Sequence, residues 1–489
     1  SKLFTELEFR TMAVRLKNVL GQNVSKEAGI EPSGGRVLVA GGSVNEQKQR
    51  EAVIMLWLIN SNITNPKLED IMAFADSKTF DDAYKALATE IKKRGLEKIW
   101  EEIEKPLMSI VDEMKEFGIK IDKAYLEKLG LEYRKELEAL EKSVWRLADT
   151  EFNIASPKQL SEILYVKLGL KTKGQKKTAG GALSTKESEL EKLAGEHPII
   201  DEILKYRELA KLLGTYIDAI PKLLDENSRI HPTFIQSGST TGRMATENPS
   251  IQNIPNKSEL GRRIRNAFIA EKGWKIVSFD YSQIELRIAA FLSGDRKLID
   301  IFQKGEDVHA AVASQVFGVP TDRVTRDMRR QAKVINFGVM YGMGVSALRA
   351  NLGTDRATAQ KFYNEYFEKF SGLRDYLERV KMETAQRGYT ETYFGRRRYF
   401  EGIKSKLPFV RSSAERMAIN APIQGTEADI AKLAMIRIDE YIKREKLERD
   451  VHMLMQVHDE IVCEARENVV KKIEPERAHR AALDRYTVP

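Results

Sequence analysis

The stretch WKIVSFDYSQIELR, residues 274–287, joins an apolar run to an amphipathic helical pattern. Its first half is rich in β-branched and aromatic residues, which favour a strand. The second half is amphipathic in a helical pattern, so we expect a helix directly after the strand. Asp280 stands at the junction, where a strand end holds a short carboxylate in a defined position.

A second apolar stretch, MLMQVHDEIVCEA at residues 453–465, predicts two strands joined by a turn at His458 and Asp459. Two aspartates from separate strands can bridge a pair of Mg²⁺ ions about 4 Å apart. Such a pair would activate an attacking hydroxyl and neutralise a triphosphate. A purely structural interpretation stays equally open from these residues alone: Asp280 caps a helix, and His458 and Asp459 only form a hairpin turn.

A helical face between these strands carries both cations and aromatic rings. In RDMRRQAKVINFGVMYGMG, residues 326–344, Arg329, Lys333, Phe337 and Tyr341 recur every four residues. Each step drifts by only about 40° around a helix, so the four side chains share one face. Cations followed by flat rings suit a triphosphate followed by a sugar and base. A solvated basic face explains only the cations, and a core face explains only the rings.

A polar helical stripe repeats the same spacing in ERMAINAPIQGTEAD, residues 415–429. It consists of Arg416, Asn420 and Gln424. Polar side chains on one face could bind the acceptors that every base pair presents in the minor groove. Taken alone the stripe is a weak indication, because polar helix stripes usually face water.

Composition bounds the class of protein. The 489 residues suggest about three domains, and 42% hydrophobic content argues against a wholly disordered chain. The longest apolar run, residues 52–59, is far shorter than the roughly 20 residues that span a bilayer, and the first residues lack a signal-peptide pattern. A single cysteine excludes an intramolecular disulfide framework and any multi-cysteine zinc site. The net charge of +8 suits a polyanionic partner if it is clustered, and a solvated charged surface otherwise.

The rest of the chain predicts mostly helices. Residues 46–104 indicate several helices, residues 101–150 a long helical block, and residues 283–387 another. One more strand is expected at 229–237, and the lysine- and glycine-rich tract at 170–185 indicates an exposed loop. The layout is α+β, with two strand clusters separated by a long helical insertion.

These stretches, in this order, resemble family A DNA polymerases of the bacterial DNA polymerase I type, from about Ile103 to Glu464. FDYSQIELR is similar to the first palm motif of the family, RRQAKVINFGVMYG to its fingers helix and QVHDE to its second palm motif. TTGRMATENPSIQNIP, residues 240–255, is similar to the segment that grips the primer–template. The resemblance implies a right-hand fold with a helical thumb, an antiparallel-sheet palm and helical fingers.

The resemblance also implies roles for individual residues. The metal ligands are Asp280, Asp459 and the backbone carbonyl of Tyr281, and Glu460 is an auxiliary carboxylate. The residues matched to nucleotide contacts are Arg329 and Lys333 on the triphosphate, with Lys333 also catalytic, His309 on the phosphate side, Phe337 on the sugar and base, Tyr341 beside the templating position and Glu285 as the steric gate. The residues matched to duplex or primer contacts are Arg243, Gln252, Asn253, Arg416, Asn420, Gln424 and His458.

The same resemblance predicts the domain boundaries. They are 1–100 for a shortened remnant of an exonuclease-like domain, 101–228 for the thumb, 229–290 and 411–489 for the two parts of the palm, and 291–410 for the fingers. Residues 1–100 are too short for the whole proofreading domain, and neither of its carboxylate motifs is placed there as the family has it. After Glu464 the chain ends sooner than the family does, so its C-terminus is atypical.

We therefore expect a template-directed DNA polymerase that adds deoxynucleotides to a primer 3′-OH with two Mg²⁺ ions, for which Mn²⁺ can substitute. Pyrophosphate is released and proofreading is absent. The expected partners are primer–template DNA and deoxynucleoside triphosphates, with no membrane, for a monomer in the cytoplasm of a bacterial or phage-infected cell.

Two other functions compete with this expectation. A single-subunit RNA polymerase shares the general arrangement of palm and fingers. Glu285 and Phe337 count against it, because a ribonucleotide site should leave room for the 2′-OH. A duplex-binding protein with an inactive polymerase fold does not need carboxylates beside phosphate-binding cations. Activity on RNA templates stays open.

Overall fold

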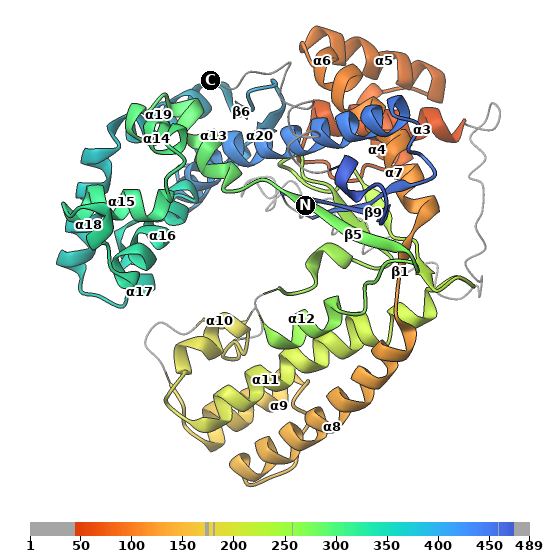
Figure 1. The fold of residues 1–489 in the computed structure, drawn as a ribbon. Helices are drawn as coiled ribbons and strands as arrows, with labels where there is room; N and C mark the ends of the chain where they lie inside the picture. The colour runs from red at the N-terminus through yellow and green to blue at the C-terminus, as the bar shows by residue number, and fades with distance from the viewer. Residues whose placement is uncertain (1–44, 172–175, 179–180, 257, 458, 474–489) are drawn as a thin grey trace.

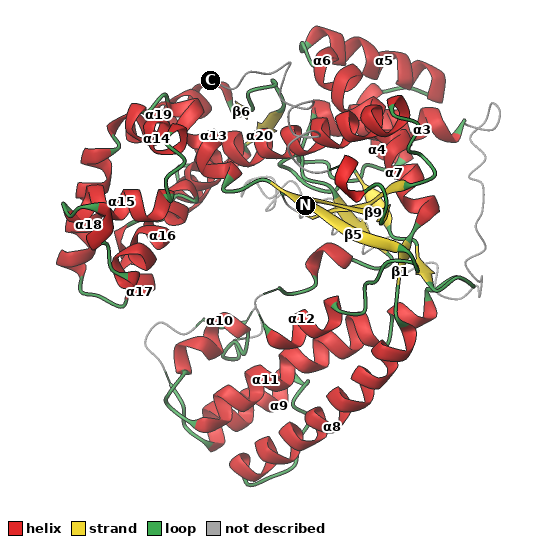
Figure 2. Ribbon diagram, in the orientation of Figure 1, coloured by secondary structure: helices red, strands yellow, loops and turns green. Residues whose placement is uncertain are grey.

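The computed structural model describes residues 45–171, 176–178, 181–256, 258–457 and 459–473. A small sheet lies near the middle of the molecule, and helices extend from it in two main directions (Figure 1, Figure 2). In the described part of the chain, no helix is both long enough and apolar enough to cross a membrane. The expected α+β architecture is confirmed.

The central sheet is antiparallel and has the strand order β5-β9-β8. Its strands are β5 Trp274–Asp280, β8 Val451–Val457 and β9 Glu460–Arg466. Both strand predictions for these stretches are confirmed. Leu107 and Met114 of helix α7 (Lys105–Phe117) and Met435 of helix α20 (Pro408–Arg444) share one apolar cluster with Met453 and Cys463 of the sheet. This cluster fixes the two long helices against the sheet.

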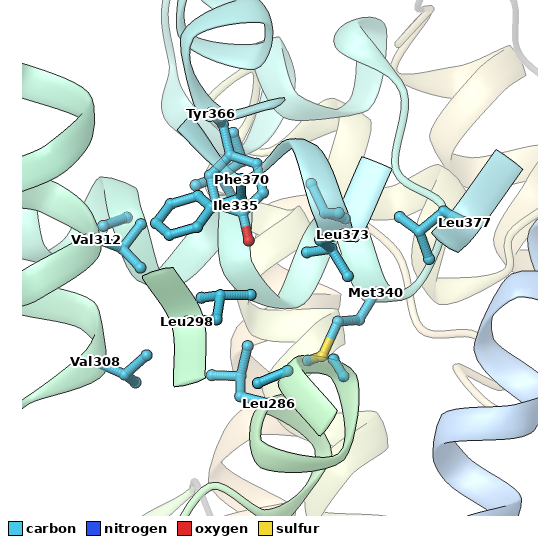
Figure 3. Packing of buried hydrophobic residues seen from close by; sticks show 14 of the residues in the cluster. Leu286, Leu298, Val308, Val312, Ile335, Met340, Tyr366, Phe370, Leu373 and Leu377 are labelled. Atoms are coloured by element: carbon cyan, nitrogen blue, oxygen red, sulfur yellow. The ribbon is translucent and has the colours of Figure 1, made fainter. Parts of the chain in front are cut away.

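A lobe made only of helices follows β5. We call it the α13–α19 lobe; its helices are α13 Ile284–Ser293, α14 Arg296–Gln303, α15 Val308–Phe317, α16 Arg326–Met340, α17 Val345–Leu352, α18 Arg356–Lys369 and α19 Ser371–Arg387. Figure 3 shows Leu286, Leu298, Ile335 and Phe370 pointing toward one another from four parts of this lobe. Burial of such side chains contributes about 1.5–3 kcal/mol each, so the core holds α16 in a fixed rotation. The expected helical block at 283–387 is confirmed.

A second helical lobe extends away from the sheet on another side (Figure 1). Its long helices α8 (Lys123–Ala148) and α11 (Pro198–Leu212) pack on each other through buried residues such as Leu129 and Leu209. Shorter elements complete this α8–α11 lobe and its junction with the sheet: α9 Pro157–Ser161, α10 Glu187–Leu190 and α12 Glu259–Arg265. The described part of tract 170–185 is non-helical, as expected, and residues 172–175 and 179–180 lie outside the described residues.

The expected helices of residues 46–104 are present. They are α3 Glu46–Ile59, α4 Leu68–Ala75, α5 Phe80–Lys93, α6 Glu97–Ile99 and a π-helical turn at Trp100–Glu104. Trp57, Leu87 and Trp100 are among the residues that give these helices a common apolar core. Residues 1–44 lie outside the described part of the chain.

Two predictions at the level of single elements are wrong. The strand expected at 229–237 is two short strands, β2 (Arg229–Ile230) and β3 (Thr233–Ile235), which belong to different sheets. Pro232 lies between them and has no N–H for a continuous ladder. β2 pairs with β1 (Ile119–Lys120), and β3 pairs with β4 (Ala245–Glu247).

The helical block expected at 101–150 is also interrupted. α7 ends at Gly118, which has φ +69°, and β1 separates it from α8. A Cβ atom at this position would lie 2.8 Å from the carbonyl oxygen of Ile230. Only glycine tolerates both the positive φ and this close approach.

Candidate active site

Three carboxylates meet at one end of the central sheet. Asp280 is the last residue of β5 and lies opposite Glu460, the first residue of β9. The backbone N–H of Tyr281 donates a 3.2 Å hydrogen bond to the carbonyl oxygen of Asp459. The strand pairing therefore brings together the acidic residues that the sequence places about 180 positions apart.

Electrostatics at this sheet end favour a bound cation. Burial raises the pKa of Asp280, and the charges of Asp459 and Glu460 raise it further. Ser278 donates its hydroxyl hydrogen bond to Glu460, which holds that carboxylate beside the strand. Because the acids repel one another, a divalent cation would stabilise their ionised forms.

The donor set fits a metal that is shared with a substrate. No group of three or more His, Cys, Asp and Glu side chains in the described ranges is arranged to hold a metal by itself. Mg²⁺ usually keeps several waters and takes only one or two carboxylates plus substrate phosphates. Asp280, Asp459 and the carbonyl of Tyr281 match this partial set, so the residues present fit Mg²⁺.

Helix α16 presents the cationic face that the sequence predicts. Thr325 caps its first turn by accepting a hydrogen bond from the backbone N–H of Met328. Arg329 and Lys333 are both exposed. Arg329 donates through Nε and Nη2 to one oxygen of Asp307, at 3.0 and 2.7 Å. Sequence reasoning missed Asp307, whose only local signal is its place at the N-cap of α15.

One ring of this face, that of Phe337, lies deeper than the cations. Phe337 is half-buried against the core of the α13–α19 lobe, and its ring centroid lies 5.6 Å from that of His309. His309 is 4% exposed, and its Nδ1 lies 3.1 Å from Nδ2 of Asn336. Burial lowers the pKa of His309, and Arg329 and Lys333 lower it further, whereas Asp307 opposes them. The structure therefore places His309 beneath the α16 face rather than on it, in surroundings that disfavour its protonated form.

Tyr341 and Glu285 are joined to an arginine from a distant loop. The hydroxyl of Tyr341, at the C-cap of α16, donates to Glu285 at 2.9 and 3.2 Å. Nη2 of Arg243 donates to the same carboxylate at 3.0 Å, and the guanidinium also binds Glu427. The resemblance assigned Arg243, Glu285 and Tyr341 to separate roles, and the structure connects them in one network.

Glu427 is the second residue that sequence reasoning missed. It is 1% exposed on α20, and burial raises its pKa to about 7, although Arg243 acts in the opposite direction. Two carboxylates share one guanidinium here, so the deeper one resists ionisation. An acid in the small and apolar run GTEADIAKLA was the available signal.

The polar stripe of α20 lies beside the end of α16. A Cβ atom on Gly342 would lie 2.8–3.0 Å from Arg416, so the turn that follows α16 touches α20 at this point. Asn420 and Gln424 are half-buried on the same helix, and the side-chain oxygen of Asn420 is buried without a hydrogen-bond partner in the described structure. The stripe is therefore adjacent to Tyr341, and its middle residue has unmet hydrogen-bonding capacity.

Of the remaining predicted contacts, Gln252 is bonded near the C-terminal end of β8. Nε2 of Gln252 donates a 2.6 Å hydrogen bond to the carbonyl of Gln456, and Asn253 is exposed and bonded to Ser250. His458 lies outside the described residues. Gln252 thus connects the segment at 240–255 to the strand that leads to Asp459.

The comparisons with known proteins agree with this geometry. Residues 123–485 match the family model described as DNA polymerase family A. The chain is 46% identical over 368 residues to the thermostable DNA polymerase I of Thermus aquaticus, covering 75% of this chain and 44% of that protein. It is 42% identical over 381 residues to DNA polymerase I of Pseudomonas aeruginosa, covering 78% of this chain and 41% of that protein. The chain spans about half the length of the curated relatives it matches.

A solved structure is similar over more of its length. It is described as the POL domain of Pol1 from M. smegmatis in complex with DNA primer-template and dNTP. The TM-score is 0.82 at 34% identity, and the alignment covers 89% of this chain and 78% of that one.

Proposed function

The chain belongs to DNA polymerase family A, and on this premise we propose that it extends a primer 3′-OH on a DNA template with deoxynucleoside triphosphates. The observation that carries the proposal is the meeting of Asp280, Asp459 and Glu460 at a sheet end. Glu285, five residues after Asp280, connects this end to the C-terminal end of α16 through its hydrogen bond from Tyr341. We propose the same division into thumb (101–228), palm (229–290 and 411–489) and fingers (291–410) that the sequence motifs predict.

The carboxylates are proposed to hold two divalent ions, Mg²⁺ or its substitute Mn²⁺. When bound, these ions would supply the positive charge that a phosphoryl transfer with pyrophosphate release requires. Asp280 and Asp459 would hold them, with the Tyr281 carbonyl as a further ligand. Glu460 remains close enough to Asp280 to add negative charge without leaving its bond to Ser278.

The cations of α16 are proposed to bind and orient the triphosphate. Lys333 is exposed and can bind a phosphate directly. Arg329 has to break its hydrogen bonds to Asp307 before it can bind one. Phe337 would pack on the sugar and base, with His309 fixing the ring from below. These contacts would place the α-phosphate in line with the primer hydroxyl.

Glu285 is proposed to exclude ribonucleotides. Its carboxylate is held by two donors, Tyr341 and Arg243, so it cannot easily swing away from an added 2′-OH. Arg243, Gln252, Asn253, Arg416, Asn420, Gln424 and His458 are proposed to contact the duplex or the primer end. We also infer that the chain acts as a monomer.

Proofreading is proposed to be absent. Between residues 45 and 100 the described elements are all helical, so no strand there can fix two carboxylates side by side. A helical surface with scattered acids is poorly suited to bind two metal ions.

Primer extension tests the proposed activity. Asp280→Ala and Asp459→Ala should each abolish extension while primer–template affinity stays close to that of the parent, because both carboxylates serve metal rather than DNA. Asp439→Ala, which removes a partly buried ion-pair partner of Lys443 on α20, is the matched control and should extend normally. Near-parental rates for either aspartate variant would contradict the metal assignment. Steady 3′ shortening that survives Asp280→Ala would contradict the absence of proofreading.

A further inference from the structure

An exposed phenyl ring stands at the start of α20. Phe409 leaves 73% of its surface exposed, compared with 45% for Tyr341 and 56% for Tyr393. Single exposed apolar side chains are common on protein surfaces and need no explanation by themselves. Exposure alone therefore does not identify Phe409 as a binding residue, and its position on the helix is the decisive observation.

Phe409 continues the polar stripe of α20. It precedes Arg416 by seven residues, which is almost two helical turns and returns to within about 20° of the same direction. Arg416, Asn420 and Gln424 follow on that face, so the ring extends the stripe by about 10 Å toward the helix start. Nη1 of Arg416 donates a 3.1 Å hydrogen bond to Ser412, which turns the guanidinium toward Phe409.

The ring lies on the side of Arg416 that faces away from the sheet. α20 begins among the helices of the α13–α19 lobe and ends over the sheet (Figure 1). Arg416 touches Gly342, next to Tyr341, which is the residue assigned to the templating position. A template strand that passes Tyr341 toward its unpaired 5′ side would therefore run over Arg416 and reach Phe409.

The surroundings of the ring are basic. Residues 398–416 contain five basic side chains and two acidic ones, a net charge of +3: Arg398, Lys404, Lys406, Arg411 and Arg416 against Glu401 and Glu415. A cationic surface with an accessible aromatic ring is the combination that binds single-stranded nucleic acid, since phosphates meet cations and bases stack on rings. The charge therefore favours unpaired DNA over an apolar protein partner.

We propose that Phe409 stacks on an unpaired template base ahead of the active site. This inference rests on the proposed polymerase function and adds a binding site to it. The rise of about 10 Å from Arg416 to Phe409 corresponds to about three stacked nucleotides at 3.4 Å each, so the contacted base lies about three positions 5′ of the base that passes Arg416. The contact anchors the incoming template and requires no particular base, because every base has a flat face.

Equilibrium binding with overhangs of two lengths tests the proposal. Phe409→Ala should lower affinity by about fivefold or more for a primer–template with an overhang of about eight nucleotides, and leave a single-nucleotide overhang unchanged. Phe409→Trp should retain the affinity, because an indole ring also stacks. Met382→Ala, which truncates another exposed apolar side chain, should change neither affinity. The measurement contains enzyme, DNA and no nucleotide.

A fluorescent base analogue, 2-aminopurine, placed about three positions into the overhang gives an independent readout. Stacking on Phe409 should quench it, and Phe409→Ala should restore its fluorescence. Equal loss of affinity at both overhang lengths, or no loss at either, would overturn the stacking site. Failure of the parent chain to bind or extend any primer–template would instead overturn the proposed function itself.

Discussion

The indole N–H of Trp57 donates a 2.7 Å hydrogen bond to the backbone carbonyl of Ser239, 182 residues later in the chain. The Ser239 hydroxyl donates in turn to the carbonyl of Arg243 at 2.7 Å, and Arg243 binds Glu285 and Glu427. The N-terminal helices therefore hold the loop that carries an arginine of the candidate active site.

Trp57→Phe should lower polymerase efficiency. The substitution retains an aromatic ring beneath Arg396 and Lys432, which lie 5.0 and 5.1 Å from the indole, but leaves the Ser239 carbonyl without its donor. Loss of this partly buried hydrogen bond costs about 0.5–1.5 kcal/mol. Steady-state primer extension should show a larger fall in kcat than rise in KM, because Arg243 is displaced.

Trp145→Phe is the matched control for this prediction. Its indole N–H also donates a 2.7 Å hydrogen bond to a backbone carbonyl, that of Phe152, but this bond lies in the α8–α11 lobe. It should lower thermal stability by a similar amount and leave kcat nearly unchanged. If both variants lose kcat to the same degree, Trp57 acts only on stability.

Glu285→Ala should raise the efficiency of ribonucleotide use relative to deoxynucleotide use by at least about tenfold. The shorter side chain leaves room for a 2′-OH, although it also frees Tyr341 and Arg243. Single-nucleotide incorporation with each sugar measures the ratio. Tyr341→Phe removes the hydrogen bond to Glu285 and keeps the carboxylate, so it should change sugar selectivity less. Equal changes in the two variants would assign the selectivity to the network and not to the bulk of Glu285.

Glu427→Gln should flatten the dependence of stability on pH. Burial raises the pKa of Glu427 from an ordinary value of 4.5 to about 7. Between these values the folded chain binds more protons than the unfolded chain, so the free energy of unfolding falls as pH rises. Glutamine cannot titrate and still accepts a hydrogen bond from Arg243. Denaturant unfolding across this window measures the slope, and an unchanged slope would show that the pKa of Glu427 in the folded chain is not raised.

Glu104→Gln should destabilise the protein by about 3–5 kcal/mol, because it leaves the buried Lys432 without its ion-pair partner, whereas Arg396 keeps Asp429. Glu104 is fully buried and accepts hydrogen bonds from Lys432 at 2.6 Å, from Arg396 and from Gln236 at 2.9 Å. Thermal unfolding measures the loss. Glu113→Gln removes an exposed partner of Lys443, a pair worth about 0–1 kcal/mol. A loss no larger than that of Glu113→Gln would mean that Lys432 gives up its proton instead.

The sequence by itself was sufficient to predict the elements whose pattern depends on neighbouring residues. Apolar, β-branched and aromatic runs predicted β5, β8 and β9, and the four-residue spacing predicted the shared face of α16. The order of the motifs along the chain was sufficient to identify the family. Periodicity and motif spacing depend only on near neighbours along the chain, so they can be read without a structure.

Only the tertiary structure decided which distant residues meet. The pairing of Asp280 with Glu460 depends on strand register, and the bonds from Arg243 to Glu427 and from Trp57 to Ser239 depend on helix packing. The same applies to the break at Gly118, where the neighbouring strand sets the space that is left. Contacts between segments far apart in sequence leave no periodic trace in either segment, because each is fixed by the packing of the whole chain.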